Sequence, residues 1–538
     1  MTSETGDALE FDYVVVGAGS AGCVLANRLS ADPAARVCLV EGGGQDRTPR
    51  IHVPAGTITL YKSDRYAYQF MSEPQEKLNG RRVHVPRGRM LGGSSSMNSM
   101  IYIRGDRSDY DGWAAMGCPG WAFDDVLPVF KRFEDDRLGL DPAFHGTGGE
   151  LAVDRPRDPN PASRRFVEAA REVGMAENPD FNGARLEGVG LYNVTQANAR
   201  RLSSYRAFVH PVRGRANLTV MTDARVDGLD LEGARVRGIV VTRNGRRLRL
   251  GSRRETVLAA GALGSPEILL RSGIGDAGEL GQAGIEPRHH LPGVGRNLQD
   301  HLDGLVTVRS ADASTLGFSA GSAPRILASP LRYLASKAGW LTTNYVEAGG
   351  FARTRFAGAV PDVQFHFVPG YRSHRGRLFE WGHGYAIHTC VLRPESRGRV
   401  FLKPGPEGPS LAIDFRFLDK EQDGRVLVEG MKLARSILAA SSFAPIRGAE
   451  IAPGPKRASD EDLMAYVRSD ASTVFHPSGT CRMGSDDLAV TGPDLKVRGL
   501  HGLRVADASI MPTLVSGNTN APSIMIGEKC AAMMLADR

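Results

Sequence analysis

A glycine-rich turn between two short apolar runs constrains the fold of this 538-residue chain more than any other feature. Residues 13–16 are apolar, and Gly17, Gly19 and Gly22 follow them before a second apolar run at 37–40. The first glycine permits a tight turn, the second leaves space for a pyrophosphate to approach the backbone, and the third lets a helix pack close to the strand. Free N–H groups at the start of that helix attract phosphate charge. The pattern therefore predicts a strand–helix–strand unit that binds a dinucleotide.

The residue that follows the second apolar run adds information about the dinucleotide. Glu41 stands nineteen residues after Gly22, and a carboxylate at this spacing accepts hydrogen bonds from ribose hydroxyls and repels a 2′-phosphate. An exposed acid after a strand is the alternative, but the spacing favours a cofactor role. Glu41 thus indicates the adenosine half of FAD or NAD and not NADP. Ser20 and Ala21, inside the glycine turn, are assigned to the same site.

Length and composition predict a multidomain globular protein without a nucleic-acid partner. A chain of 538 residues is expected to form two or three domains, and 41% hydrophobic and 24% charged residues are typical of soluble proteins. The net charge of +7, from 67 basic and 60 acidic residues, is small for this length. The pairs Arg246-Arg247 and Arg253-Arg254 have no aromatic residues between them, so we interpret them as solvated strand ends.

Cysteine and histidine spacing gives no metal site. The six cysteines form no C-x-x-C pair, so we expect reduced thiols. His289, His290 and His301 lack carboxylates or thiolates at ligand spacing, and we interpret them as solvated or structural. The first ten residues carry no signal-peptide pattern, and no apolar stretch is long enough to span a bilayer. We expect a cytoplasmic protein, with peripheral membrane association and the oligomeric state left open.

Strand and turn signals continue the nucleotide-binding half further along the chain. A strand is predicted at 217–221, a hairpin turning at Asn244-Gly245, and another strand at 256–260. The helix that follows is predicted over 267–271, with Pro266 in its first turn because proline suits that position.

The region 306–469 has the features of a separate sheet-plus-helix domain. Residues 362–368 alternate as in a strand. Phe365, Phe367, Tyr371 and Trp381 either line an apolar pocket or belong to the core, and the sequence leaves both readings open. Further strands and helices are expected at 330–338 (helix), 400–402 and 411–417 (strands), 423–438 (helix) and 460–468 (helix, with Asp460 as a plausible N-cap).

Four other segments carry chemistry-bearing residues: 88–98, 291–301, 475–484 and 503–522. The small residues of the first suit close approach to a ligand, although a flexible loop explains them equally well. The second resembles a loop of defined conformation more than a linker, but its residues alone do not indicate a chemical role. In the third, His476 stands among small residues and has a side chain suited to proton abstraction near neutral pH, although a lone histidine is usually structural. In the fourth, Asn520 precedes Ala521-Pro522 at a helix start, where it caps the helix or faces a ligand.

Together these segments resemble the glucose–methanol–choline (GMC) family of FAD oxidoreductases, and most of all its bacterial choline-dehydrogenase-like and alcohol-dehydrogenase-like members. The specific pieces are the opening glycines, the Gly92-Gly93-Ser94-Ser95 run with Asn98, residues 261–266, and the stretches around His476 and Asn520. The resemblance implies FAD as cofactor, a small-molecule alcohol as substrate, and oxygen or a quinone as electron acceptor.

The resemblance also implies a fold and its division into domains. The expected class is α/β plus α+β, with a Rossmann-like FAD-binding domain assembled from discontinuous segments and a substrate domain built from an antiparallel sheet with helices. The FAD-binding domain is predicted to comprise 1–155, 200–305 and 470–538, and the substrate domain 156–199 and 306–469.

Residue roles follow from the same resemblance. His476 falls on the catalytic base and Asn520 on the second catalytic position. Asp507 and Ala508 fall at the phosphate and ribityl part of FAD, Val226 near the adenine, Asn98 and Ile101 near the flavin edge, and Asn518 and Thr519 beside the flavin ring. The full cofactor-binding set is Gly17, Gly19, Ser20, Ala21, Gly22, Glu41, Arg89, Gly92, Gly93, Ser94, Asn98, Ile101, Val226, Ala260, Gly261, Asp507, Ala508, Asn518 and Thr519.

One position departs from part of the family. Choline oxidases attach FAD to a histidine just before the asparagine of the Gly-Gly segment, and here Met97 stands there. A thioether cannot supply the ring nitrogen of that bond, so non-covalent FAD is expected.

The expected reaction is oxidation of a primary alcohol to an aldehyde, by proton abstraction at His476 and hydride transfer to flavin N5. Choline dehydrogenase proper is an alternative. Another is a lyase like the algal fatty-acid photodecarboxylases, but these lack the histidine and place a cysteine immediately before Arg-Pro, whereas two residues separate Cys390 from Arg393-Pro394. A non-catalytic flavoprotein is the third, against which the presence of His476 and Asn520 argues.

Overall fold

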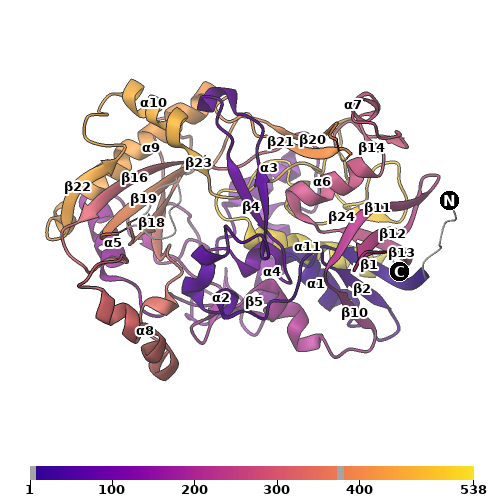
Figure 1. The fold of residues 1–538 in the computed structure, drawn as a ribbon, viewed down its shortest axis with the longest axis horizontal. Helices are drawn as coiled ribbons and strands as arrows, with labels where there is room; N and C mark the ends of the chain where they lie inside the picture. Colours follow the sequence, from indigo (N-terminus) through magenta and orange to yellow (C-terminus); the bar gives the residue numbers. More distant parts are fainter. Residues whose placement is uncertain (1–7, 372–380, 407, 538) are drawn as a thin grey trace.

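Two seven-stranded sheets at opposite ends of an elongated molecule organise the fold (Figure 1). The computed structural model describes residues 8–371, 381–406 and 408–537. Residues 1–7, part of the N-terminal stretch expected to hold no signal peptide, lie outside the described residues. The predicted fold class, α/β plus α+β, is confirmed.

The first sheet takes its strands from distant parts of the chain, in the order β10-β2-β1-β13-β12-β11 with β24 beside β13. Its core is the predicted strand–helix–strand unit, in which β1 pairs in parallel with β2 and α1 connects them. The strands are β1 (Ala8–Val16), β2 (Val37–Val40), β10 (Leu218–Met221), β11 (Ala224–Glu232), β12 (Arg235–Arg243), β13 (Arg246–Leu258) and β24 (Leu503–Val505).

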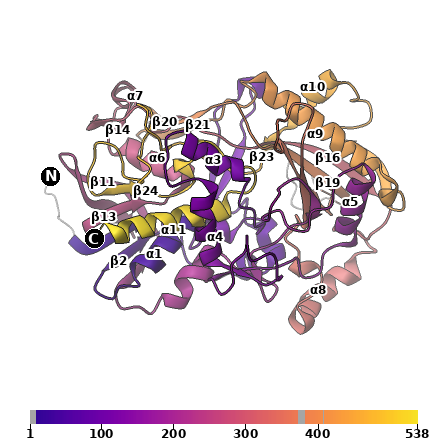
Figure 2. The same cartoon turned by 180° about the vertical axis from the view of Figure 1, so that it is seen from behind.

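Helix α1 (Ser20–Leu29) lies beside the C-terminal helix α11 (Asn520–Ala536), as Figure 2 shows from behind. A Cβ placed on Gly527 of α11 would come within 2.7 Å of the carbonyl oxygen of Ala21. Only glycine permits this approach, which brings the end of the chain back to the first glycine turn.

The hairpin turn at Asn244-Gly245 is confirmed, with φ of 50° and 73° at the two residues, as a two-residue hairpin turn requires. The second strand of that hairpin and the strand predicted at 256–260 join into one strand, β13. The helix after it, α6 (Gly261–Arg271), begins earlier than predicted, so the placement of Pro266 in its first turn was wrong.

Pro266 is tolerated inside α6 because another residue satisfies the backbone group it leaves free. Proline has no N–H to donate to the carbonyl four residues before it. That carbonyl, of Ala262, accepts instead from the hydroxyl of Thr480 at 2.7 Å. Because the proline leaves the carbonyl of Ala262 free, the Thr480 hydroxyl can link α6 to the segment that carries His476.

The second sheet is antiparallel, in the order β22-β16-β19-β18-β17-β7 with β23 beside β16, and helices α5, α9 and α10 accompany it (Figure 1). Its elements are β7 (Gly188–Leu191), β16 (Leu302–Ser310), β17 (Ala348–Ala352), β18 (Val363–Val368), β19 (Gly384–Val391), β22 (Arg447–Ala452), β23 (Ser472–Thr473), α5 (Pro161–Glu172), α9 (Glu421–Ala439) and α10 (Asp460–Asp470).

The two faces of β18 serve different purposes. Phe365 and Phe367 are fully buried in the core of the second sheet, and Phe367 stacks on Phe166 of α5 at a centroid distance of 4.9 Å. They are therefore core and not pocket wall. Trp381 is 74% exposed and lines no buried pocket either. The side chain of Gln364, on the opposite face, hydrogen-bonds to Asn518.

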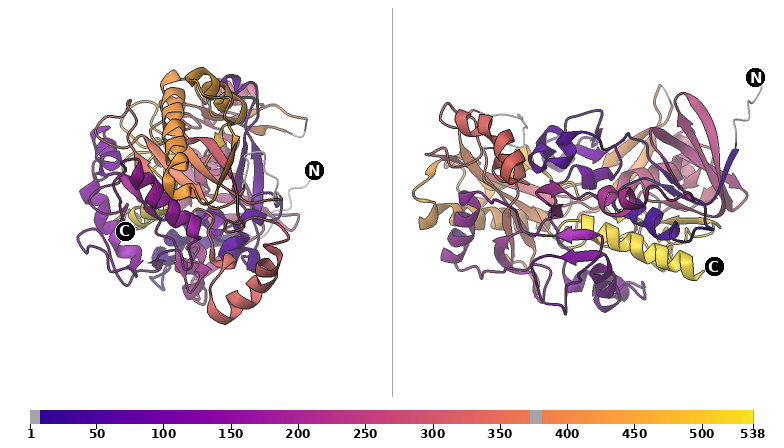
Figure 3. Two further views of the ribbon diagram at one scale, coloured as in Figure 1. Left: turned by 90° about the vertical axis from the view of Figure 1, so that its left-hand side faces the viewer. Right: turned by 90° about the horizontal axis from the view of Figure 1, so that it is seen from below.

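Smaller elements complete the fold, and the structure corrects the start of one predicted helix and the N-cap of another. The helix predicted at 330–338 begins at Ala323 (α8), at the periphery of the molecule (Figure 3). Ser459, not Asp460, caps α10, since its hydroxyl accepts from the N–H of Asp462 at 3.1 Å. The others are α2 (Pro49–His52), α3 (Arg107–Ala115), α4 (Phe123–Phe133), α7 (Ala277–Gln282), the hairpin β20 (Arg399–Lys403) with β21 (Ser410–Asp414), which contacts α6, and the short pairs β3 (Ala67–Met71) with β4 (His84–Gly88), β5 (Glu134–Asp136) with β6 (Leu151–Val153), β8 (Gln196–Ala197) with β9 (Arg200–Arg201), and β14 (Ile274–Gly275) with β15 (His289–His290).

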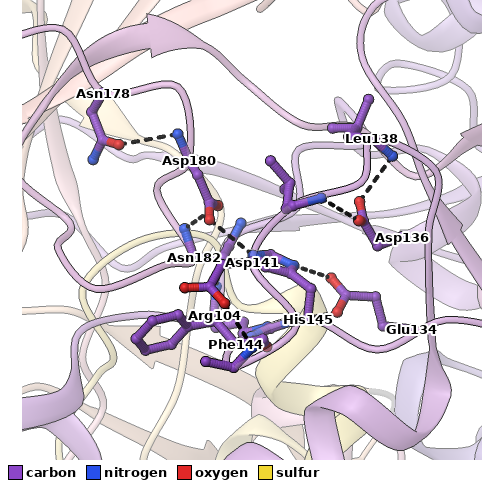
Figure 4. A network of polar contacts seen from close by, with 12 residues as sticks. Arg104, Glu134, Asp136, Leu138, Asp141, Phe144, His145, Asn178, Asp180 and Asn182 are labelled. Carbon is purple, nitrogen blue, oxygen red and sulfur yellow. Dashed lines mark hydrogen bonds and ion pairs between the residues drawn. The ribbon is translucent and has the colours of Figure 1, made fainter.

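A buried charge network ties together three segments near β5 (Figure 4). The ring nitrogens of His145 lie 3.1 Å from Glu134 Oε1 and 2.9 Å from Asp180 Oδ2. Arg104 pairs with the other oxygen of Glu134 at 2.5 Å. Because both ring nitrogens of His145 face carboxylates, the imidazole is held as a cation.

None of the helices in the described part of the chain combines the length and apolar character needed to cross a bilayer.

Candidate active site

The first glycine turn leaves an open, uncapped helix N-terminus. Gly17 has φ of +99°, and a Cβ on it would lie 2.5 Å from the carbonyl oxygen of Ala259. A Cβ on Gly22 would lie 1.8 Å from the carbonyl oxygen of Gly17, whereas one on Gly19 would meet only Ala259 O, at 3.9 Å. Helix α1 has no side-chain cap and no acid in its first turn. Packing within the protein requires glycine at positions 17 and 22. At Gly19 it does not, and the free space there fits a phosphate ligand.

Glu41 closes one side of this turn. Its carboxylate accepts hydrogen bonds from the N–H groups of Ala18 (2.9 Å) and Gly43 (2.8 Å). Burial raises its pKa to about 7, an effect that the two N–H bonds only partly offset. The carboxyl group is thereby fixed at the end of β2, and its contact with a ribose stays a prediction.

The Gly92-Gly93 segment packs directly on the glycine turn. The N–H of Gly92 donates to Ala18 O at 2.8 Å, and a Cβ on Gly93 would lie 2.8 Å from the Cα of Gly19. Met97, in the same segment, is 2% exposed and packs among apolar side chains, where its thioether offers no nitrogen for a covalent link.

The C-terminal segment returns to the same place. Asp507 Oδ2 accepts from the N–H of Gly261 at 2.8 Å and from Ser265 Oγ at 2.5 Å, at the start of α6. Asn520 Oδ1 accepts from Ser20 Oγ at 2.7 Å, at the start of α1. The N-termini of α1 and α6 are therefore surrounded by four segments that are distant in the sequence: 17–22, 92–93, 261–265 and 507–520.

His476 is held from the backbone outward. Its N–H donates to Asp300 Oδ1 at 2.8 Å. The preceding Phe475 has φ of +70°, a strained conformation for a bulky residue, and Arg87 holds its carbonyl oxygen at 2.7 Å. Strain of this kind gathers at functional sites. These backbone contacts of Phe475 and His476 therefore fix the position from which the imidazole extends.

The imidazole of His476 is buried and uncharged. Its Nδ1 lies 3.0 Å from Nδ1 of His301, with the two rings perpendicular at 89°. Burial, together with the neighbouring His301, His366 and Arg87, holds the pKa of His476 well below its usual 6.5. Its other nitrogen, Nε2, lies 3.3 Å from the amide nitrogen of Asn518. An uncharged imidazole and an amide donor therefore face one another.

Comparison with known proteins agrees with this architecture. Two family models described as GMC oxidoreductase match residues 11–303 and 394–527. The chain belongs to the GMC oxidoreductase family. As a member it is an FAD-dependent oxidoreductase.

Relatives of known name match nearly the whole length of this GMC chain. An alcohol dehydrogenase (acceptor) of Pseudomonas putida is 44% identical over 527 residues, which are 98% of this chain and 96% of its own. The mitochondrial choline dehydrogenase of Homo sapiens is 40% identical over 97% of this chain and 89% of its own. The crystal structure of pyridoxine 4-oxidase from Mesorbium loti is similar with a TM-score of 0.88 at 33% identity, covering 97% and 98% of the two chains.

The structure places the two asparagines against different neighbours. The amide oxygen of Asn520, predicted as the second catalytic residue, bonds to Ser20 at α1. The amide that faces His476 belongs to Asn518, which was expected beside the flavin ring. Helix α11 begins at Asn520, so the two asparagines lie on either side of a helix start and point to different neighbours.

The remaining predicted cofactor residues stay predictions, and their surroundings differ. Ile101 is buried in an apolar cluster, and Val226 is partly buried in β11. Asn98 Oδ1 accepts from Arg201 at 2.8 Å. Arg89 is exposed, with its guanidinium 5.4 Å from the ring centroid of Tyr68. The others lie in elements already described: Ala21 in α1, Ser94 after Gly93, Ala260 before α6, Ala508 after Asp507, and Thr519 at the N-cap of α11.

Two residues of the site were missed from the sequence. His301, interpreted as solvated or structural, is fully buried against His476. Gln364 of β18 donates to Asn518 at 3.2 Å. The sequence pointed to the segment 291–301 and to the polar positions of the strand at 362–368, but neither pattern indicates which residue the side chain contacts. No cluster of metal-binding side chains occurs among the described residues.

Proposed function

We propose that this GMC protein oxidises a primary alcohol to the corresponding aldehyde. The observation that carries the proposal is the facing pair of His476 and Asn518, a buried neutral imidazole 3.3 Å from an amide nitrogen. One substrate hydroxyl can use both groups at once, by donating its proton to the imidazole and accepting from the amide.

His476 acts as the general base. Its depressed pKa keeps the ring uncharged and able to accept the hydroxyl proton. Asn518 acts as the donor that stabilises negative charge as it grows on the alcohol oxygen. Burial of the site, with His476 only 9% exposed, strengthens both interactions because little water competes for them.

FAD, when bound, supplies the acceptor for the hydride that leaves the alcohol carbon. On the protein side, the uncapped start of α1 and the open space at Gly19 would receive its pyrophosphate, and Glu41 its ribose. Met97 supports non-covalent attachment. Acid denaturation should then release the flavin into the supernatant, and flavin colour in the precipitate would contradict non-covalent binding.

Choline oxidation is the second candidate, because relatives named choline dehydrogenase align over the whole chain. A quaternary ammonium group favours aromatic faces with a nearby acid. Of the buried acids here, Asp300 already accepts from the backbone of His301 and His476 and from Thr473. We therefore favour an uncharged alcohol, with oxygen or a quinone as electron acceptor.

The proposal is tested by anaerobic mixing of the FAD-loaded protein with a panel of primary aliphatic alcohols, aromatic alcohols and choline. Bleaching of the flavin reports oxidation of the alcohol, and parallel oxygen uptake and dye reduction identify the acceptor. The variant His476→Ala should slow bleaching by about 10² to 10⁴ while FAD stays bound. Absence of bleaching with every alcohol would refute the proposal and favour a lyase or a non-catalytic flavoprotein. An unchanged rate of bleaching in His476→Ala would refute His476 as the base.

A further inference from the structure

We infer that a directional chain of hydrogen bonds, anchored at both ends on backbone carbonyls, fixes the tautomer of His476 with its proton on Nδ1 and its lone pair on Nε2. The inference rests on the proposed function, for which Nε2 is the base. It assigns His301, Gln364 and Tyr192 as positioning residues, because they act on the base through its neighbours.

The first arm of the chain reaches Nδ1 of His476. Nε2 of His301 lies 3.1 Å from the carbonyl oxygen of Leu392, which can only accept, so Nε2 carries a proton. Burial lowers the pKa of His301 to about 3, although the backbone carbonyls of Leu392 and Val515 act to raise it, so the ring is neutral and carries one proton. With that proton on Nε2, Nδ1 of His301 is bare. That bare nitrogen lies 3.0 Å from Nδ1 of His476, which must therefore donate.

The second arm reaches Nε2 of His476 independently. The hydroxyl of Tyr192 donates to the carbonyl oxygen of Phe365 at 2.7 Å, so its oxygen is free to accept. It accepts from the amide nitrogen of Gln364 at 3.1 Å, and the same nitrogen donates to Asn518 Oδ1 at 3.2 Å.

With its oxygen thus engaged, Asn518 presents its amide nitrogen to His476 Nε2 at 3.3 Å. A donor on that side requires a lone pair on Nε2. The two arms begin at different backbone carbonyls, those of Leu392 and Phe365, and assign the same tautomer.

Burial makes the alternative arrangement costly. Tyr192, His301 and Gln364 are all fully buried. Turning the amide of Gln364 over would set its oxygen against the oxygens of Tyr192 and Asn518, and a buried polar atom left unpaired is destabilising. An imidazole without this chain would divide between two tautomers, one of which presents N–H where the base must accept a proton.

The decisive experiment reads the tautomer directly. Histidine-selective nitrogen-15 labelling of the FAD-loaded protein, with the His476 signals assigned by their loss in His476→Ala, distinguishes a protonated ring nitrogen from a bare one. We expect a bare Nε2 in the parent protein. A protonated Nε2 there would overturn the inference even if His476 were the base.

Two variants test the arms separately. Gln364→Glu keeps the size of the side chain but removes both N–H donors, so Asn518 should turn its oxygen toward His476 and draw the proton to Nε2. His301→Leu removes the acceptor for Nδ1, and His301→Gln, which retains one donor and one acceptor, is its matched control. We expect a protonated fraction at Nε2 and flavin reduction slowed about 10- to 100-fold in the first two, with KM changed less than threefold, and partial recovery of the rate in His301→Gln.

The outcomes separate this inference from the proposed function. If His476→Ala is inactive while Gln364→Glu and His301→Leu keep the parent tautomer and a rate within twofold, the hydrogen-bond chain is refuted and the proposed function stands. If His476→Ala reduces flavin at the parent rate, the proposed role of His476 as base falls, and the nitrogen-15 spectrum still decides the tautomer.

Discussion

The amide nitrogen of Asn518 lies 3.3 Å from Nε2 of His476, whereas the amide oxygen of Asn520 accepts from Ser20 Oγ at 2.7 Å. Two asparagines separated by one residue thus serve different places, one at the base and one at the first turn of α1. The start of helix α11 between them causes the separation, because it turns the backbone.

This geometry predicts opposite phenotypes for the two alanine variants. Asn518→Ala removes the donor that faces the base and should slow flavin reduction by about 10² to 10³, the usual effect of losing one such donor. Asn520→Ala should weaken FAD binding but leave the reduction rate within about threefold once FAD is saturating. Stopped-flow reduction and flavin titration of both proteins measure the two effects. A slow, FAD-saturated Asn520→Ala beside a normal Asn518→Ala would reverse the assignment.

The N-terminal part of the site could be predicted because most of its contacts join residues that are close in the sequence. Gly22 and Glu41 make their contacts within a single strand–helix–strand unit, and their spacing can be read from the sequence. The hairpin at Asn244-Gly245 is local in the same way.

The pairing at His476 could not be predicted in this way because it is set by distant partners. His301 lies 175 residues away in sequence and Gln364 reaches Asn518 across 154. A motif gives the residue type but not the direction of its side chain, so the resemblance did not predict that Asn518 lies beside His476. The position of Pro266 in α6 failed for the same reason, since a hydroxyl 218 residues away from Ala262 makes it tolerable.

The pH dependence of the reaction follows from the depressed pKa of His476. As the proposed base, His476 works when it is unprotonated. Burial lowers its pKa below 6.5, so kcat/KM should not fall on account of His476 until the pH is below that value. Asp300, whose pKa burial raises to about 6, titrates in the neighbouring range. Profiles of kcat/KM from pH 5 to 9 for the parent and Asp300→Asn separate the two groups. A limb centred at or above pH 6.5 that persists in Asp300→Asn would contradict the burial argument.

The two glycines of the first turn give a matched pair of variants. Gly22→Ala places a Cβ 1.8 Å from Gly17 O and should destabilise the fold itself, by several kcal/mol as overpacking does. Gly19→Ala meets only Ala259 O at 3.9 Å, so the fold should tolerate it, while the methyl group enters the space expected for the pyrophosphate. Thermal unfolding of the FAD-free proteins and flavin titration distinguish the two. Tight FAD binding by Gly19→Ala would place the phosphate elsewhere.

The buried network around His145 predicts a stability that depends on pH. Burial by itself lowers the pKa of His145, but its hydrogen bonds to Asp180 and Glu134 outweigh that effect and raise the pKa to about 9. The folded value lies above the unfolded value of about 6.5, so the stabilisation is complete below pH 6.5 and is lost as the pH rises through 9. Removing one partner of a buried charged pair typically costs about 3 kcal/mol.

His145→Gln should therefore lower the Tm by several degrees at pH 6 and by much less at pH 9.5, because the parent protein loses the charged ring over this interval. Exposed His290, outside the network, supplies the control variant His290→Gln, whose Tm should follow that of the parent at both pH values. Differential scanning calorimetry of the three proteins measures the differences. An equal loss of Tm in His145→Gln at both pH values would mean that shape and not charge holds His145 between Glu134 and Asp180.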